Sequence, residues 1–173
     1  MKLLIHACCA DCLLKMVESI KEENRFKEIV VYYYNPNIHP RSEYQSRLKA
    51  MKLMIGDSKM IIPDWRPSEY FGVIKNKEKE KRCIDCWKLR LEETAKFAKK
   101  NEFDGFTSTL LTSEYQKTDT IEKIGKEIGK KYKIEFLIPK KVCKNLETKG
   151  FYKQVFCGCC YSLAEKFEEK FSG

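Results

Sequence analysis

The chain has 173 residues, with 34 Lys and Arg against 25 Asp and Glu, so its formal net charge is +9. Hydrophobic residues make up 43% of the sequence, which is too apolar for a disordered chain. No apolar run approaches the roughly 18 residues of a membrane span. We therefore expect no membrane partner, and the length predicts a single α/β domain over residues 1–173.

Strand and helix patterns alternate along the chain. In chain order, the patterns predict a strand over 2–7, a helix beginning near Cys12, a strand over 29–34, a helix over 44–55, a strand over 60–62, a helix over 84–98, a strand over 104–109, a helix over 121–128, a strand over 134–138 and a C-terminal helix over 163–171. Ser42 with Gln45, and Asp119 with Glu122, predict caps for two of these helices. The alternation is typical of an α/β fold with a parallel sheet flanked by helices.

Polar and cysteine residues follow several predicted strands. Residues 6–9 end the first strand, residues 34–37 end the second, and residues 107–109 end a later one. Ligands of parallel sheets bind at the carboxyl ends of the strands, so we expect these segments to open onto one crevice.

The nine cysteines fall into groups rather than being spread along the chain. Eight of them lie in three clusters, which are Cys8, Cys9 and Cys12, then Cys83 and Cys86, then Cys157, Cys159 and Cys160. Cys143 stands alone and has no predicted role. The apolar run at the N-terminus is too short for a signal peptide, so we expect a reducing, cytoplasmic setting in which grouped cysteines serve metal or redox chemistry.

The first two clusters predict a metal–sulfur site. Cys83 and Cys86 form a CxxC motif, and the adjacent pair Cys8 and Cys9 ends the first strand. Four thiolates from two segments are enough for a [4Fe–4S] cluster, which we favour over zinc because neighbouring cysteines strain to bind one small ion. Cys12 is a candidate further ligand or ligand of a second metal, and its alternative is an ordinary helix-facing thiol.

The third cluster predicts a redox pair. One glycine separates Cys157 from Cys159, so a disulfide between them would close a small, strained and easily reduced ring. The alternative is that these cysteines complete the metal site. Cys160 has no predicted role.

Substrate contacts are predicted in two polar segments. Asn35, Asn37 and His39 lie in a conformationally restricted loop, and Gln116 follows a tyrosine farther along the chain. Turn structure or ordinary surface is the alternative for each. Basic runs at 75–82 and 140–149 suit a polyanion such as RNA, although most such runs are solvated faces.

These motifs together resemble one family over residues 3–162. They are His6-Ala7-Cys8-Cys9-Ala10, Tyr34-Asn35-Pro36-Asn37-Ile38-His39-Pro40 with Glu43-Tyr44 and Arg47, Arg82-Cys83-x-x-Cys86 with Arg90-Leu91 and Thr94-Ala95, Phe103-Asp104-x-Phe106-Thr107-x-Thr109-Leu110, and Cys157-Gly158-Cys159. In this order and spacing they closely resemble the epoxyqueuosine reductase QueH family. Each motif alone is unspecific, and the combination is specific.

The resemblance implies a Rossmann-like fold related to adenine-nucleotide α-hydrolases, with a cysteine-bearing helical tail at the C-terminus. It implies reduction of epoxyqueuosine to queuosine at the wobble position of tRNA, driven by an electron donor that the sequence does not identify. It also implies a [4Fe–4S] cluster on Cys8, Cys9, Cys83 and Cys86, and a redox-active pair of Cys157 and Cys159. A second, mononuclear iron is considered for the family.

Position 12 often carries Asp or Cys in that family, which makes Cys12 a candidate ligand of the second iron. Asp11 is a weaker candidate, because a carboxylate at a helix start is ordinary capping and many members have Pro there. Two other functions fit the residues. One is a zinc-bound RNA-binding module without catalysis, and the other is a thiol oxidoreductase that acts on proteins.

Overall fold

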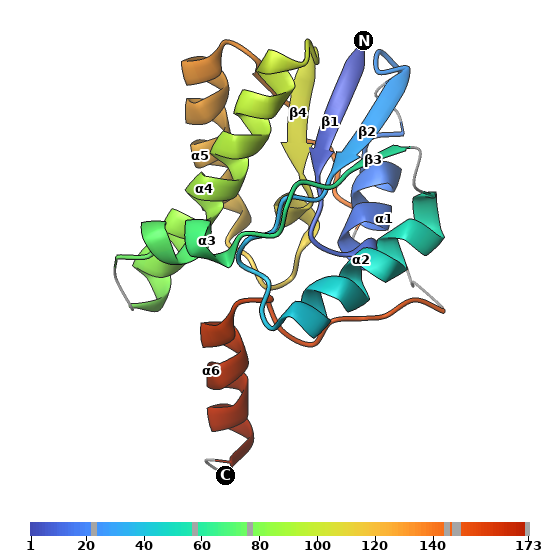
Figure 1. The fold of residues 1–173 in the computed structure, drawn as a ribbon. Coiled ribbons are helices and arrows are strands. Elements are labelled where there is room, and N and C mark those ends of the chain that lie inside the picture. The colour runs from blue at the N-terminus through green and yellow to red at the C-terminus, as the bar shows by residue number, and fades with distance from the viewer. Residues whose placement is uncertain (22–23, 57–58, 76–77, 144–145, 147–149, 172–173) are drawn as a thin grey trace.

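The computed structural model describes residues 1–21, 24–56, 59–75, 78–143, 146 and 150–171. Five parallel strands form one sheet in the order β3-β2-β1-β4-β5 (Figure 1). The strands are β1 (Lys2–His6), β2 (Glu28–Tyr32), β3 (Met60–Ile61), β4 (Gly105–Ser108) and β5 (Glu135–Phe136). The order reverses between β1 and β4, which is the switch point where ligands of such sheets bind.

Within the described ranges, six α-helices and the 3-10 helix η2 connect and flank these strands. They are α1 (Ala10–Ser19), α2 (Arg41–Ile55), α3 (Pro67–Val73), α4 (Lys79–Lys100), the 3-10 helix η2 (Thr109–Thr112), α5 (Thr118–Tyr132) and α6 (Cys160–Phe171). α4 packs against β1, β4 and α5, while α1 packs beside α2 (Figure 1). The predicted parallel sheet flanked by helices is confirmed.

The central strand β1 is the centre of the core. Leu3, Leu4 and Ile5 are fully buried, and β1 is paired on both sides along their length. A continuous apolar run is what a parallel strand covered on both faces requires. The rigid centre of the sheet therefore ends directly at Cys8 and Cys9, and fixes where those two residues emerge.

Two local predictions are wrong. α4 begins at Lys79 rather than at residue 84, so Cys83 lies inside the helix together with Cys86. α2 and α5 begin after Pro40 and Lys117 without a side-chain capping hydrogen bond, so the two predicted caps do not form. The short helices α3 and η2 were not predicted.

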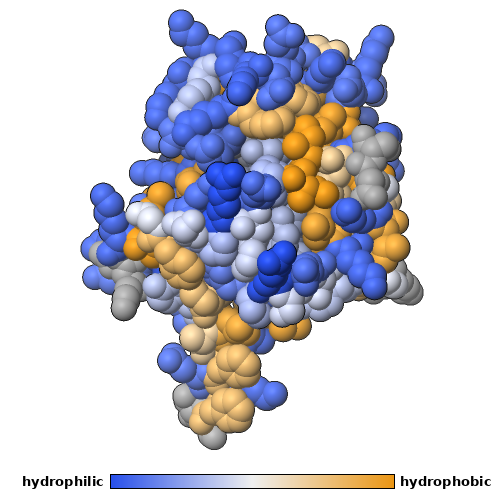
Figure 2. Space-filling model, in the orientation of Figure 1, coloured by the Kyte–Doolittle hydropathy of each residue, from blue (hydrophilic) through white to orange (hydrophobic). Residues whose placement is uncertain are grey.

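The C-terminal helix α6 projects away from the sheet (Figure 1). None of its residues is buried, and Phe167 and Phe171 are 56% and 77% exposed. Apolar side chains follow α6 to its C-terminal end (Figure 2). The cysteine-bearing helical tail that the sequence predicts is thus present. Among the described helices, none has the length and apolar character needed to cross a membrane.

Candidate active site

A buried histidine joins the strand ends that surround the site. His6 Nε2 lies 3.1 Å from the Tyr34 carbonyl oxygen, and Nδ1 lies 2.8 Å from Ser108 Oγ. Because a carbonyl only accepts, Nε2 carries the proton and Ser108 donates to Nδ1. Burial lowers the pKa of His6 to about 4. His6 is therefore neutral, and its two hydrogen bonds connect the ends of β1, β2 and β4.

Cys8, Cys9 and Cys12 form one buried sulfur group at the start of α1. Their three Sγ atoms lie within 4.8 Å of one another. Cys9 is the N-cap of α1, and its Sγ accepts from the backbone N–H of Cys12 at 3.4 Å. Hydrogen bonds from Cys12 and Cys9, with help from nearby Arg90, hold the pKa of the Cys8 thiol well below its ordinary value. The neighbouring Cys9 and Cys12 thiols have raised pKa values, so within this group the thiolate, the form of cysteine that binds metals, is favoured at Cys8.

Two polar residues lie beside this sulfur group. Thr109, at the start of η2, accepts from the Cys8 backbone N–H at 3.3 Å, and its Oγ1 lies 3.5 Å from Cys8 Sγ. Asp11 pairs with Lys15 at 2.8 Å on the same helix. Its carboxylate is thus engaged by a cation, as expected for an acidic residue in the first turn of a helix.

Cys83 and Cys86 occupy a separate position on α4. In the described part of the chain, the group of sulfurs within 4.8 Å contains only the three cysteines of α1 and its cap. Cys86 packs instead with Cys159 and Tyr70. Burial raises the pKa of Cys86 to about 12. The structure thus places the two predicted ligand pairs on different elements, with Cys159 beside the second pair.

Arg90 connects the separate thiols electrostatically. It lies one turn after Cys86 on α4, and only 1% of it is exposed. Its charge acts on Cys86, Cys157, Cys8 and Cys159, which come from all three cysteine clusters. The crevice is therefore lined by sulfur around one buried positive charge.

The loop that carries Cys157 is held by a buried ion pair. Arg47 is 1% exposed, and its Nε donates to Glu43 Oε1 at 2.6 Å, one helical turn away on α2. Its two terminal nitrogens donate to the carbonyl oxygens of Phe156 at 3.0 Å and Cys157 at 3.1 Å. Sequence reasoning assigned Arg47 no role. The spacing of Glu43 and Arg47 signals a pair, but not its partner 110 residues away.

Gly158 and His39 complete this anchor. Gly158 has a φ of +127°, and its carbonyl accepts from the His39 backbone N–H at 2.8 Å. His39 Nδ1 accepts from the Cys160 backbone N–H at 3.4 Å, at the first residue of α6. His39, which the sequence predicts as a substrate contact, therefore hydrogen-bonds to Cys160, which has no predicted role.

Gln116 contacts the predicted redox pair instead of open solvent. Its Nε2 donates to Cys157 Sγ at 3.1 Å, and its Oε1 accepts from Trp87 Nε1 at 2.6 Å. Burial raises the pKa of Cys157 to about 11, and the Gln116 hydrogen bond acts in the opposite direction. Gln116 therefore positions a thiol in this structure.

Several buried polar atoms around the crevice have no hydrogen-bond partner within the described ranges. They are Asn35 Oδ1, both amide atoms of Asn37, His39 Nε2, Arg90 Nη2 and Gln154 Oε1. Asn35 Nδ2 is used by the Ala7 carbonyl at 2.8 Å, and Gln154 Nε2 donates to Cys9 Sγ at 3.0 Å. Buried polar groups are normally paired, so this concentration of unpaired atoms is what a site that binds polar ligands presents.

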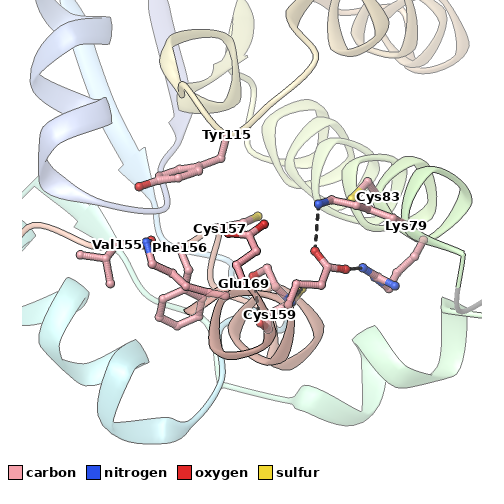
Figure 3. A pocket seen from close by; sticks show the side chains of 12 residues that line it. Lys79, Cys83, Tyr115, Val155, Phe156, Cys157, Cys159 and Glu169 are labelled. Atoms are coloured by element: carbon pink, nitrogen blue, oxygen red, sulfur yellow. Dashed lines mark hydrogen bonds and ion pairs between the residues drawn. The ribbon is translucent and has the colours of Figure 1, made fainter. Parts of the chain in front are cut away.

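An open pocket leads to the thiols. Cys83, Cys157 and Cys159 line it together with the exposed ring of Tyr115 (Figure 3). Lys79, Arg82, Glu165 and Lys166 also line the pocket, and Glu165 of α6 pairs with Lys79 at 3.0 Å and with Arg82. The basic run at 75–82 thus reaches the pocket, whereas residues 144–145 and 147–149 of the basic run at 140–149 lie outside the described part of the chain.

All nine cysteines are free thiols in the structure. Cys143 lies apart, and its backbone N–H donates to Ser19 Oγ at 2.8 Å. The sheet order and the thiol-lined crevice at its switch point define a Rossmann-like α/β protein with a candidate metal or redox centre.

Comparison with known proteins identifies the family. The model of the epoxyqueuosine reductase QueH family matches residues 3–165. The relative named epoxyqueuosine reductase QueH from Dehalococcoides mccartyi is 34% identical over 175 residues, which cover 96% of this chain and 94% of the relative. The relative of that name from Thermotoga maritima is 32% identical over 189 residues, which cover 96% and 92%. The chain therefore belongs to the epoxyqueuosine reductase QueH family and is an oxidoreductase of queuosine biosynthesis.

Proposed function

We propose that this chain reduces epoxyqueuosine to queuosine at the wobble position of tRNA in the cytoplasm. It does so with a [4Fe–4S] cluster held by Cys8, Cys9, Cys83 and Cys86, and with Cys157 and Cys159 as a redox pair. The observation that carries the proposal is the gathering of thiols from three chain segments around Arg90, at the switch point of the sheet.

The donor set supports an anionic metal–sulfur group. The group of candidate metal ligands found within the described residues consists of three thiols, and one of them, Cys8, has a lowered pKa. Arg90 adds a buried positive charge and an unpaired N–H donor. Soft thiolates are the ligands that iron–sulfur clusters and zinc prefer over magnesium or calcium. When bound, the cluster supplies one-electron transfer and a Lewis acid for the departing oxygen.

Cys12 is the proposed ligand of a second, mononuclear iron. Its sulfur lies in the same group as those of Cys8 and Cys9, which supports a ligand role over that of an idle helix-facing thiol. Asp11 has weaker support, because Lys15 already neutralises its carboxylate. We therefore expect loss of Cys12 to affect bound iron more than loss of Asp11.

The protein's own thiols can balance the reaction. Conversion of an epoxide into an alkene and water consumes two electrons and two protons. Oxidation of the Cys157 and Cys159 thiols to a disulfide releases two electrons and two protons. An external electron donor must then reduce that disulfide before the next turnover. Both residues line the open pocket, which gives substrate and donor a route to them.

Polar side chains at the crevice would hold the substrate. Asn37 and His39 offer buried atoms that are unpaired within the described chain, and Asn35 offers one further oxygen. Tyr115 is 41% exposed at the pocket, where an unstacked anticodon base could lie against its ring. Lys79 and Lys166, which also line the pocket, would contact phosphates.

The first test is anaerobic purification followed by metal, sulfide and turnover analysis. We expect a brown protein with about four sulfides and about five irons per chain, four in the cluster and one in the mononuclear site, which converts epoxyqueuosine tRNA in the presence of a chemical reductant. Cys157→Ser should abolish turnover, whereas Cys143→Ser, which alters a cysteine outside the crevice, should retain it. Full turnover by Cys157→Ser would reject the redox pair.

The same experiment separates the competing functions. A colourless protein that holds zinc and binds tRNA without turnover would overturn the proposal in favour of an RNA-binding module. The Cys8, Cys9 and Cys12 sulfurs all lie within 4.8 Å of one another, which gives that outcome a structural basis, since one small ion can bind to all three. Reduction of protein disulfides in place of epoxyqueuosine tRNA would instead indicate a thiol oxidoreductase.

A further inference from the structure

Arg90 is a buried cation without a carboxylate partner in the described part of the chain. It is 1% exposed on α4, and its Nε makes one long hydrogen bond of 3.4 Å to the Cys86 carbonyl oxygen. Its Nη2 has no partner among the residues described. Thr94 Oγ1 donates to the Arg90 carbonyl, a contact that involves the backbone of Arg90 and not its guanidinium.

The other fully buried arginine of the site, Arg47, has the ion-pair and hydrogen-bond partners that a buried guanidinium requires. Arg47 is also 1% exposed, but Glu43 lies 2.6 Å from its Nε and two carbonyl oxygens accept from its terminal nitrogens. A guanidinium is always charged in proteins, and burying it without a compensating anion is very costly. An anion other than a carboxylate must therefore face Arg90 in the working protein.

Sulfur is the chemistry that surrounds this charge. Cys86, Cys157, Cys8 and Cys159 interact with it, and no acidic side chain is among its main electrostatic partners. Thiols become anions when they bind a metal, because the ligand form is the thiolate. The group that best matches the position is thus an anionic metal–sulfur centre, with Nη2 directed at one of its sulfur atoms.

We propose that Arg90 is the counter-charge of the iron–sulfur centre, donates a hydrogen bond from Nη2 to one of its sulfurs, and raises its reduction potential. The inference rests on the proposed function, because it needs that centre to be bound. Reduction adds negative charge to the centre, and a fixed buried cation stabilises the more negative form. Hydrogen bonds to sulfur and net charge are known levers on such potentials. Arg90 is a positioning residue here and has no assigned step in the reaction.

The decisive measurement is a spectroscopic redox titration of the anaerobically purified protein. Arg90→Met removes both the charge and the hydrogen-bond donors and introduces an apolar side chain suited to burial. Arg90→Lys keeps the charge but lacks the planar guanidinium and its N–H donors. At a fixed potential, we expect Arg90→Met to lower the ratio of reduced to oxidised centre at least tenfold, which is about 59 mV for one electron. Arg90→Lys should lie between Arg90→Met and the unaltered protein.

Lys88→Gln is the matched control, since it removes a positive charge from an exposed position two residues away on α4. Its potential should equal that of the unaltered protein. An Arg90→Met protein with iron, sulfide and an unshifted potential would overturn the inference while leaving the proposed function intact. An unaltered protein without iron and sulfide would overturn the proposed cofactor, and this inference with it.

A second measurement does not depend on how the variants fold. Unaltered protein labelled with ¹⁵N-arginine should show a nitrogen hyperfine coupling to its reduced, paramagnetic centre. The coupling should persist in Arg66→Lys, which changes an exposed arginine at the start of α3. A reduced centre without any arginine coupling would reject the hydrogen bond.

Discussion

Two glutamine side chains donate amide hydrogens to cysteine sulfurs at the site. Gln116 Nε2 lies 3.1 Å from Cys157 Sγ, and Gln154 Nε2 lies 3.0 Å from Cys9 Sγ. Trp87 decides the orientation of the first amide, because an indole N–H only donates and must therefore face Oε1. The NH₂ group is left to point at Cys157. A donor aimed at sulfur favours the thiolate over the thiol.

Gln116→Leu should make Cys157 less reactive. A hydrogen bond to a charged group contributes about 1.5–3 kcal/mol, and the loss of that amount would lower the thiolate fraction and slow alkylation roughly tenfold or more. The measurement is the rate of iodoacetamide modification of the Cys157 peptide in metal-free protein, followed by mass spectrometry. Gln45→Leu, on an exposed position of α2, is the control. Equal rates in both variants would show that the amide does not activate the thiol.

Gly158→Ala should displace Cys157 and Cys159, the two cysteines on either side of this glycine. The φ of +127° disfavours any L side chain, and an added Cβ would lie 3.2 Å from Arg47 Nη1 and from Ile38 Cγ1. We expect the free energy of unfolding to fall by about 1–3 kcal/mol and turnover to fall with it. Gly150→Ala is the control, because it also has a positive φ but meets nothing within 4 Å. Urea unfolding that lowers both variants equally would argue against crowding by Arg47.

At the scale of elements, the parts of the fold with a regular apolar period could be predicted and the rest could not. β1 is a continuous apolar run, and α5 repeats Ile at helical spacing, so both are legible locally. The start of α4 could not be predicted from the local sequence, because its first turn, Lys79–Arg82, contains only charged residues. α3 has a single buried residue, Tyr70, and so shows no periodic stripe.

The same limit applies to the site. The position of the cysteines at strand and helix ends followed from the sequence, since a parallel sheet gathers its carboxyl ends. The partners of Arg47 and Gln116 did not, because Cys157 is 110 and 41 residues away from them. Such contacts depend on the path of the C-terminal loop under α2, and no local pattern encodes that path.

Packing of α5 on the edge strand β5 gives a prediction at this scale. A Cβ added at Gly125 would lie 2.1 Å from Phe136 Cε1, which forces the helix and strand apart. We expect Gly125→Ala to lower the free energy of unfolding by about 1–3 kcal/mol. Gly72→Ala, in α3 with nothing within 4 Å, should instead be neutral or stabilise by about 0.5–1 kcal/mol. Similar denaturant midpoints for the two variants would contradict the close approach.

At the scale of the whole molecule, charged side chains lie at the surface around the pocket, and the thiols lie beneath them. The chain carries a net charge of +9, and hydrophilic side chains cover much of the face in Figure 2. The thiols lie beneath that layer and reach solvent through the pocket beside α6. Lys79 and Lys166 lie where the two layers meet. A long polyanion can thus be held outside while one nucleoside enters.

This arrangement predicts a steep salt dependence of tRNA binding. Each phosphate that a cation neutralises contributes about −0.7 to −0.9 to the slope of log affinity against log salt concentration. Lys79→Gln should therefore weaken binding and reduce the slope by roughly one. Lys27→Gln is the control, because it removes an exposed charge just before β2, at the amino ends of the strands.

The measurement is filter binding of epoxyqueuosine tRNA between about 50 and 200 mM salt. Lys79 is paired with Glu165, so Glu165→Gln supplies the opposite test. Removing that carboxylate frees Lys79 and takes a negative charge from the pocket wall, and tRNA should then bind more tightly. Unchanged slopes for all three variants would show that the phosphates are held by another face. A gain in affinity for Glu165→Gln, with a loss for Lys79→Gln, would locate the RNA at the mouth of the thiol-lined pocket.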